Sequence, residues 1–190
     1  MNDTPVYLVT GFLESGKTTF IQDTLQDKKF CEGDNILVIA CEEGEVELDP
    51  TLFGGDNVAL EVIEDSEDMS PEMFIKLQKK HSATKILVEY NGMWQLGDLY
   101  EAAPENWVIG QEILFFDATT VKSYNANMRS LVVDKIQNAD LIVFNRIKDS
   151  DDTMEFHKLV RALSRSAAII YEKATGEIAY DEIEKKKKKK

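Results

Sequence analysis

Residues 6–20 read VYLVTGFLESGKTTF, and the expected fold follows from this stretch. Its first five residues are largely apolar and predict a buried strand, and the residues after it predict a helix. Between the two, GFLESGKT at residues 11–18 fits G-x-x-x-x-G-K-[ST]. Strand, loop and helix in this order are the context in which that motif forms a phosphate-binding P-loop. The residues predicted to bind nucleotide here are Gly11, Glu14, Ser15, Gly16, Lys17, Thr18 and Thr19.

The chemistry of such a loop is specific. Its backbone N–H groups converge on phosphate oxygens, and the helix N-terminus adds partial positive charge. Lys17 would act catalytically by reaching the outer phosphates and stabilising the charge that develops there, and the Thr18 hydroxyl would ligate Mg²⁺. Glu14 is unusual because it places a carboxylate beside the phosphates. A Glu14 side chain that points outward would cost little, whereas one that points inward would weaken binding or act on a bound group.

Apolar runs alternate with helical patterns along the rest of the chain. Strands are predicted at residues 36–41, 58–63, 85–90, 112–117, 140–145 and 167–171. Helices are predicted at residues 18–26, from Ser70 onward, and at 96–103, 121–136 and 156–163. Most of these strands are apolar throughout, as in a parallel sheet that is buried on both faces. The pattern predicts an α/β, three-layer P-loop NTPase fold, with a mostly parallel sheet and helices on both faces.

Length and charge limit the classes of function. The 190 residues suit one domain, which we assign to residues 1–180, followed by a charged, disordered tail at residues 181–190. The net charge is −13 although residues 185–190 are all lysine, so the folded body would repel nucleic acids and anionic membranes. No apolar run is long enough to predict membrane insertion. The two cysteines form no C-x-x-C pair and no signal pattern is present, so we expect a cytoplasmic protein.

Acidic residues that follow other strands are candidates for a magnesium site. In an open parallel sheet, ligands bind at the carboxyl ends of the strands, so these residues can meet the P-loop. Glu89 lies near the end of a predicted strand, and the backbone N–H of Gly92 could meet a γ-phosphate. Asp49 ends an acidic loop that reads either as a switch segment or as a solvated loop. We predict Thr18, Asp49 and Glu89 as metal ligands, and Asp49 and Glu89 also as catalytic residues.

Base recognition is predicted at residues 145–149, which read NRIKD. An Asn at the end of a late strand, followed closely by an acid, is typical of sites that read guanine. The acid accepts hydrogen bonds from the guanine N1–H and amine, which adenine cannot match. Here Lys148 stands three residues after Asn145 and cannot accept, and Asp149 comes one residue later. Asn145 and Arg146 are predicted to bind nucleotide, with Arg146 stacked on the base, and guanine or adenine specificity stays open.

Taken together, these residues resemble the CobW/HypB/UreG group of P-loop GTPases, and most of all its CobW-type branch. The resemblance covers residues 6–171 and rests on GFLESGKTT, GEVELD, EYNG, FFDA and NADLIVFN in that order. It implies a GTPase that delivers metal ions or metal-bearing cofactors to client proteins. The chain departs from the family in three ways: EDSED at residues 64–68 stands near the place of the C-x-C-C metal motif, the base motif is altered, and the usual C-terminal domain has no counterpart.

The leading hypothesis is a Mg²⁺-dependent GTP-binding protein that hydrolyses GTP slowly, because no catalytic base stands out. It would serve as a metallochaperone or cofactor-insertion accessory protein, with GTP, GDP and Mg²⁺ as ligands. Its partners would be a client metalloprotein or a separate protein that resembles the missing domain, and a homodimer is compatible with the family. A delivered transition metal stays open without the cysteine motif, since carboxylates favour harder cations and Cys41 reads as a lone ligand or a buried hydrophobe. The alternatives are a switch or scaffold protein that does not hydrolyse nucleotide, and an ATP-using relative.

Overall fold

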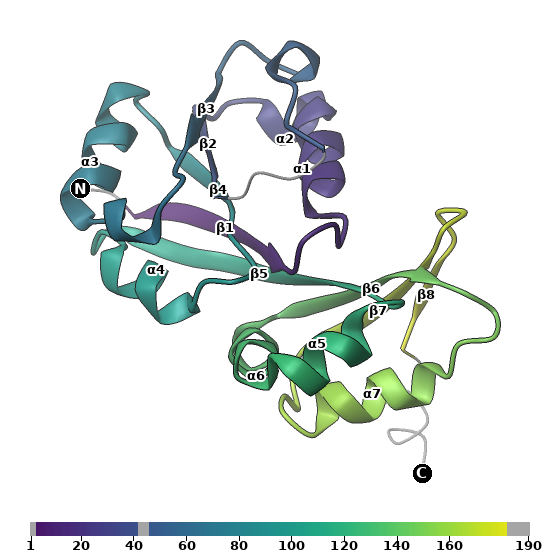
Figure 1. Ribbon diagram of the computed structural model, residues 1–190. Coiled ribbons are helices and arrows are strands. Elements are labelled where there is room, and N and C mark those ends of the chain that lie inside the picture. The colour runs from purple at the N-terminus through teal and green to yellow at the C-terminus, as the bar shows by residue number, and fades with distance from the viewer. Residues whose placement is uncertain (1–2, 42–45, 182–190) are drawn as a thin grey trace.

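A computed structural model of the chain describes residues 3–41 and 46–181 (Figure 1). Within these residues, eight strands form one sheet in the order β3-β2-β4-β1-β5-β6-β7-β8. Neighbouring strands are parallel, except that β8 runs antiparallel to β7. The strands are β1 (Thr4–Gly11), β2 (Ile36–Ala40), β3 (Val58–Val62), β4 (Lys85–Glu89), β5 (Trp107–Asp117), β6 (Leu141–Ile147), β7 (Ala168–Lys173) and β8 (Ile178–Tyr180).

Helices cover both faces of this sheet (Figure 1). They are α1 (Lys17–Gln26), α2 (Lys28–Cys31), α3 (Pro71–Lys80), α4 (Leu96–Ala102), α5 (Val121–Asn127), α6 (Arg129–Asn138) and α7 (Thr153–Arg161). Ile21 and Leu25 of α1 pack on one face, and α3 to α7 supply the apolar side chains that pack on the other. The prediction of a three-layer α/β fold with a mostly parallel sheet is confirmed.

β1 lies in the middle of the sheet, between β4 and β5. Its side chains Val6, Leu8 and Val9 are fully buried, because one face of the strand meets α3 and α4 and the other meets α1. The P-loop follows β1 at the carboxyl edge of the sheet. Strands β4, β5 and β6 run parallel to β1 and end at the same edge. The segments that follow them therefore begin beside the P-loop.

Several elements differ from the sequence-based expectation. The helix predicted at residues 121–136 is broken at Met128, whose backbone (φ −131°, ψ 44°) separates α5 from α6. Asn127 contributes to the break, because its side chain donates to the Ser123 carbonyl and so competes with helical hydrogen bonding. β5 begins at Trp107 rather than at residue 112, and α2 and β8 had not been predicted.

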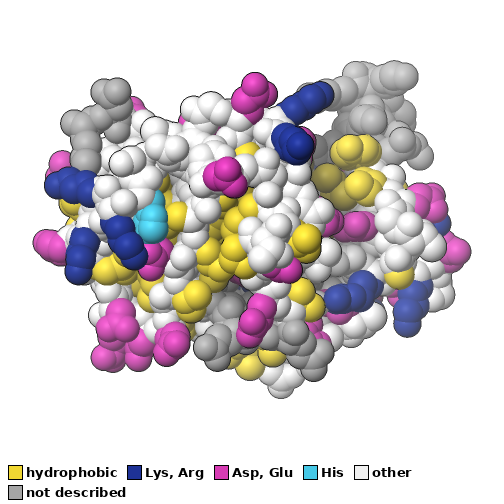
Figure 2. Space-filling view, turned by 90° about the horizontal axis from the view of Figure 1, so that it is seen from above, with side chains coloured by type: hydrophobic (Ala, Val, Ile, Leu, Met, Phe, Trp, Pro, Cys, Tyr) yellow, Lys and Arg dark blue, Asp and Glu magenta, His cyan; other side chains and the backbone are white. Residues whose placement is uncertain are grey.

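The surface is mixed in character. None of the helices in the described residues is long and apolar enough to cross a membrane. Seen from above the view of Figure 1, hydrophobic side chains gather near the middle of the face, and acidic and basic side chains lie mostly around them (Figure 2). Residues 42–45 of the predicted acidic loop and residues 182–190 of the predicted tail lie outside the described residues. The assignment of residues 181–190 to a tail stays a prediction.

Candidate nucleotide-binding site

The loop between β1 and α1 has the backbone of a tight phosphate-binding turn. Gly11 and Gly16 have φ angles of 140° and 101°, which favour glycine, and Glu14 adopts the left-handed region at φ 58°. A Cβ on Gly11 would lie 2.2 Å from the Phe115 carbonyl oxygen, so only glycine fits there. The Glu14 side chain is exposed, which matches the outward alternative considered from the sequence.

Lys17 is buried at the start of α1. Its Nζ donates a hydrogen bond to the carbonyl oxygen of Phe12, within the same loop, at 2.9 Å. The ammonium is therefore held against the loop backbone, at the place where the motif requires a positive charge. An ammonium has three N–H donors, so the bond to Phe12 does not by itself prevent Lys17 from donating to a phosphate oxygen.

Thr18 and Glu89 lie together although they are far apart in the sequence. The Thr18 hydroxyl donates to Oε1 of Glu89 at 2.5 Å. Glu89 is buried at the end of β4, and its backbone pairs with Val9 of β1 just before the P-loop. A hydroxyl and a carboxylate are the oxygen ligands that Mg²⁺ uses beside nucleotide phosphates, so their chemistry fits this ion.

Gly92 brings the segment after β4 against the P-loop. A Cβ at this position would lie 2.4 Å from the Gly11 carbonyl oxygen and 2.7 Å from the Phe12 Cα. The turn is held by Asn91, whose Oδ1 accepts from the Met93 N–H at 2.8 Å. Close backbone approach, rather than side-chain chemistry, is what this glycine provides.

The contacts of Asp49 are with Thr51 and Gln22. Its carboxylate is exposed and accepts hydrogen bonds from the hydroxyl and the N–H of Thr51, which hold the pKa of Asp49 below its usual range. Its backbone exchanges two hydrogen bonds with the side chain of Gln22 on α1. A role at Mg²⁺ would require the Thr51 bonds to break, and that role stays a prediction.

Asn145 and Arg146, at the end of β6, are tied to the P-loop. Asn145 Nδ2 donates to the Ser15 carbonyl at 3.3 Å, and its Oδ1 accepts from the Arg146 N–H at 2.6 Å. Arg146 Nη1 donates to the Glu14 carbonyl and to Asp117 Oδ2, both at 2.6 Å. Burial raises the pKa of Asp117, but the bonds from Thr119 and Arg146 outweigh it and leave that pKa below its usual range.

Two cavities flank the P-loop. The larger, of about 500 Å³, lies over β5, β6 and β7 beside α1, and Asn145, Arg146 and Thr19 are among its lining residues. Glu172 and Lys173 of β7 line it as well, and sequence analysis had not identified them. The signal that could have found them is their position at the carboxyl end of a strand, where ligands bind in open parallel sheets.

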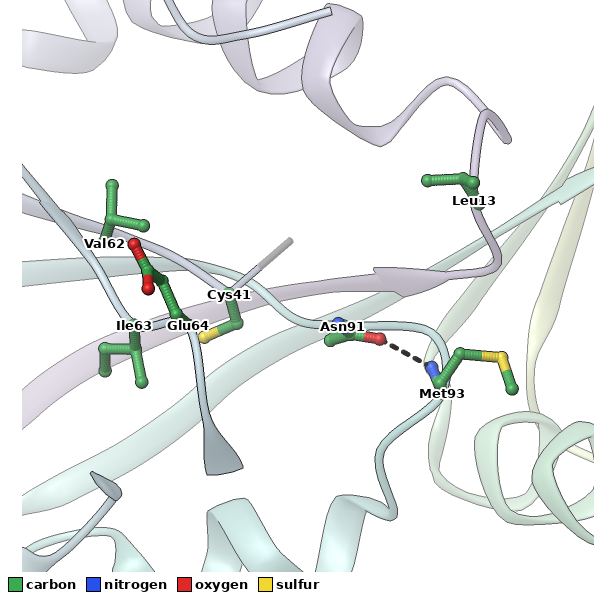
Figure 3. Close-up of a pocket in the computed structure, with 7 residues that line it drawn as sticks. All are labelled: Leu13, Cys41, Val62, Ile63, Glu64, Asn91 and Met93. Atoms are coloured by element: carbon green, nitrogen blue, oxygen red, sulfur yellow. Dashed lines mark hydrogen bonds between the residues drawn. The ribbon is translucent and has the colours of Figure 1, made fainter. Parts of the chain in front are cut away.

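The smaller cavity, of about 380 Å³, lies on the other side of the loop and is lined by Leu13, Cys41, Val62, Ile63, Glu64, Asn91 and Met93 (Figure 3). Cys41 and Glu64 bring a thiol and a carboxylate to it, and the Met93 thioether and the Asn91 amide also line it. Within residues 3–41 and 46–181, no three His, Cys, Asp or Glu residues are grouped to hold a metal ion. Cys41 is buried and is not in a disulfide, so the alternatives of metal ligand and buried hydrophobe both fit it.

Comparison with known proteins agrees with this geometry. The family model described as "CobW/HypB/UreG, nucleotide-binding domain" matches residues 5–171. The zinc chaperone YjiA of Escherichia coli (strain K12) is 23% identical over 186 residues, which cover 89% of this chain and 57% of YjiA. This chain therefore spans just over half the length of that relative.

Solved structures share the fold. The crystal structure of Zn(II)-bound YjiA GTPase from E. coli superposes with a TM-score of 0.63 at 22% identity, over 89% of this chain and 57% of YjiA. The hydrogenase maturation factor HypB from Archaeoglobus fulgidus gives a TM-score of 0.59 at 16% identity, over 91% of this chain and 82% of HypB. FlhF complexed with GMPPNP and Mg²⁺ gives 0.55 at 15% identity, over 95% of this chain and 70% of FlhF. At these identities the similarity establishes the fold alone.

Proposed function

This chain belongs to the CobW/HypB/UreG family of nucleotide-binding domains, and from that premise we propose that it binds GTP with Mg²⁺, hydrolyses it slowly and assists metal or cofactor delivery. The proposal places the protein in the cytoplasm, acting on a client metalloprotein or with a partner that supplies a further domain. The observation that carries it is the Thr18–Glu89 hydrogen bond beside Lys17, at a P-loop on the carboxyl edge of the sheet.

The residues of this site fit a magnesium ion and a triphosphate. Thr18 and Glu89 would hold the ion, which when bound neutralises charge on the phosphate oxygens. A hydroxyl hydrogen-bonded to a buried carboxylate can exchange that bond for an ion with little rearrangement, since both oxygens already face the same point. The family's use of GTP and the known preference of such sites for hard cations support this part of the proposal.

Binding and charge stabilisation would come from the loop itself. The N–H groups at the start of α1 and the Lys17 ammonium would bind the outer phosphates and stabilise the negative charge that develops as the terminal phosphoryl group is lost. The close approach of Gly92 would hold the neighbouring turn against the loop, so that its N–H could also face the terminal phosphate.

Slow hydrolysis is expected from the same contacts. The two carboxylates predicted to be catalytic are engaged by other groups: Glu89 would hold Mg²⁺ together with Thr18, and Asp49 accepts from Thr51. The GTP-bound state would therefore persist long enough for the metal or cofactor to be delivered to the client protein. In this proposal the delivered metal ion is cargo, distinct from the Mg²⁺ at the nucleotide. The cavity lined by Cys41 and Glu64 is the candidate site for it.

One observation favours a second candidate function, a nucleotide-binding switch or scaffold without hydrolysis. Glu14 places a carboxylate in the phosphate-binding loop. Its side chain is exposed, and its negative charge would oppose a bound triphosphate strongly only if it turned toward the phosphates. An ATP-using protein is the third outcome that an experiment must separate.

Calorimetric titration with GDP, GTP, ADP and ATP in the presence of Mg²⁺ tests the proposal, with Lys17→Ala as the control variant. We expect guanine nucleotides to bind more tightly than adenine nucleotides, and Lys17→Ala to remove binding. Phosphate release under single-turnover conditions then separates a slow GTPase from a switch. Equal affinity for guanine and adenine nucleotides would overturn the guanine assignment. If neither the native protein nor Lys17→Ala binds any nucleotide, a scaffold protein is the remaining candidate.

A further inference from the structure

Glu172, on β7, is a carboxylate in the cavity beside the P-loop. Alternate residues of β7 face opposite sides of the sheet: Ile169 and Tyr171 pack in the core with α7, whereas Ile170 and Glu172 line the cavity. The neighbouring strands β6 and β7 lie side by side (Figure 1). Residues near their carboxyl ends line this cavity together with residues from the start of α1. Among the described residues, no side chain donates a hydrogen bond to the half-buried Glu172 carboxylate or forms an ion pair with it.

We infer that Glu172 is the residue that reads the base, by accepting hydrogen bonds from the N1–H and the exocyclic amine of guanine. This inference rests on the proposed nucleotide-binding function and specifies its substrate. The cavity has an apolar floor that includes Phe115, Val143 and Ile170, and a volume within the usual range of small-molecule sites. A planar base on that floor would present its polar edge to the groups at the rim.

The cavity is continuous with the predicted phosphate site. Gly16 and Thr19 line it, and they immediately flank Lys17 and Thr18. A nucleotide whose phosphates lie on the P-loop would therefore extend its base into this cavity. Asn145 lines the same cavity as Glu172, from the neighbouring strand β6. Its side chain is engaged by the Ser15 carbonyl and the Arg146 N–H, so it positions the loop and leaves the selection of the base to another group.

The other acids near the motif are less suited to this role. The Asp149 side chain is 88% exposed, pairs with Lys173 Nζ at 3.0 Å and is absent from the cavity lining among the described residues. Asp23 of α1 does line the cavity, but it is exposed and lies one helical turn beyond Thr19, away from the carboxyl edge of the sheet. Glu172 alone of these three is both half-buried and in the cavity at the carboxyl end of a strand.

The chemistry predicts a change of specificity. A carboxylate can only accept hydrogen bonds, so it matches the two adjacent donors of guanine and opposes the N1 acceptor of adenine and the C2 oxygen of xanthine. Glutamine in its place would offer its oxygen to N1–H and its amide N–H to the C2 oxygen. Glu172→Gln should therefore shift preference from guanosine to xanthosine diphosphate.

The experiment is calorimetric titration of the full chain with GDP, ADP, IDP and XDP in Mg²⁺. For the unmodified protein we expect GDP to bind about 100-fold more tightly than ADP or XDP, and IDP, which lacks the amine, about tenfold more weakly than GDP. Glu172→Gln should lower the affinity for GDP about 100-fold and raise the affinity for XDP. Glu172→Asp, which keeps the charge, should retain GDP preference with reduced affinity.

Asp149→Asn and Asp23→Asn are the matched controls and should keep the order of preference. If either control produces the shift to XDP, or if Glu172→Gln leaves the ratio of GDP to XDP affinity unchanged, the inference is wrong. Binding of all four nucleotides with equal affinity would overturn the inference while nucleotide binding stands. Failure of every nucleotide to bind, with no effect of Lys17→Ala, would overturn both the inference and the proposed function.

Discussion

The Thr18 hydroxyl on α1 and the Glu89 carboxylate at the end of β4 are joined by a hydrogen bond of 2.5 Å across 71 residues of sequence. The bond forms because β4 pairs directly with β1, so the end of β4 comes to the P-loop that follows β1. Glu89 is buried, and a buried carboxylate needs a donor or a cation. In the proposed site, Mg²⁺ would take the place of this hydrogen bond, with the Thr18 hydroxyl bound through an oxygen lone pair and keeping its proton.

Removing either oxygen of this pair should weaken magnesium-dependent binding. Thr18→Val and Glu89→Gln are each expected to lower the affinity for nucleotide about tenfold or more when Mg²⁺ is present, and much less when it is absent. Calorimetric titration with and without Mg²⁺ measures the difference. Thr24→Val is the matched control, because the Thr24 hydroxyl donates to the Phe20 carbonyl within α1 and, among residues 3–41 and 46–181, is bonded to no group of the proposed site. Equal losses with and without Mg²⁺ would contradict a metal-ligand role.

Gly92→Ala should destabilise the fold and distort the P-loop. The added Cβ would meet the backbone of Gly11 and Phe12 at 2.4 and 2.7 Å, and backbone atoms cannot move aside as a flexible side chain can. We expect a loss of about 1–3 kcal/mol in the free energy of unfolding, together with weaker nucleotide binding.

Urea denaturation measures this loss, and Gly97→Ala is the control. Gly97 lies in α4, where an added Cβ would meet nothing within 4 Å. That change should stabilise the protein by about 0.5–1 kcal/mol through helix propensity. Similar effects of the two substitutions would refute the steric role of Gly92.

Glu14→Gly should stabilise the protein. Glu14 has a φ of 58°, a left-handed conformation that costs about 1 kcal/mol for a residue with a Cβ. Glycine removes that cost, whereas Glu14→Ala removes the carboxylate and keeps the strain. Thermal and urea unfolding should therefore rank glycine above both alanine and the native residue. Nucleotide affinity that improves in both variants would report the lost charge, and equal stability of the two variants would exclude backbone strain.

Glu112→Gln should change how stability depends on pH. Glu112 is buried on β5, accepts from the Tyr100 hydroxyl at 2.6 Å, and lies near Asp134, Asp140 and Lys135. Burial, together with the two neighbouring acids, raises its pKa from 4.5 to about 7, although Tyr100 and Lys135 act in the opposite direction. The folded state therefore holds a proton that the unfolded state releases at lower pH.

The sign of this effect follows from proton linkage. The contribution of Glu112 is most favourable below pH 4.5 and is lost as the pH rises to about 7, by on the order of 3 kcal/mol. Glu112→Gln should remove that decline and be more stable than the native protein at pH 8. Urea denaturation at a series of pH values measures it, with the exposed Glu101→Gln on α4 as control. Parallel pH profiles for the native protein and Glu112→Gln would refute the raised pKa.

Local sequence was a good guide to the elements and a poor guide to their interruptions. The apolar runs predicted the strands from β1 to β7. In central strands such as β2 and β4, burial on both faces requires apolar residues throughout, whereas β3 at the sheet edge is only half-buried. The break at Met128 went unpredicted, since the apolar period runs through it and the side-chain bond of Asn127 to Ser123 does not affect that period. β8 was missed because its three residues are exposed and carry no buried pattern.

The sequence by itself determined the P-loop, the class of fold and the family, since each depends on short motifs and on periodicity that neighbouring residues carry. Only the tertiary structure decided that Arg146 binds Asp117 and the Glu14 carbonyl, that the Asp49 carboxylate binds Thr51, and that Glu172 faces the cavity. These partnerships depend on strand order and register, which long-range packing sets. A side chain on one strand carries no local record of which strand will lie beside it.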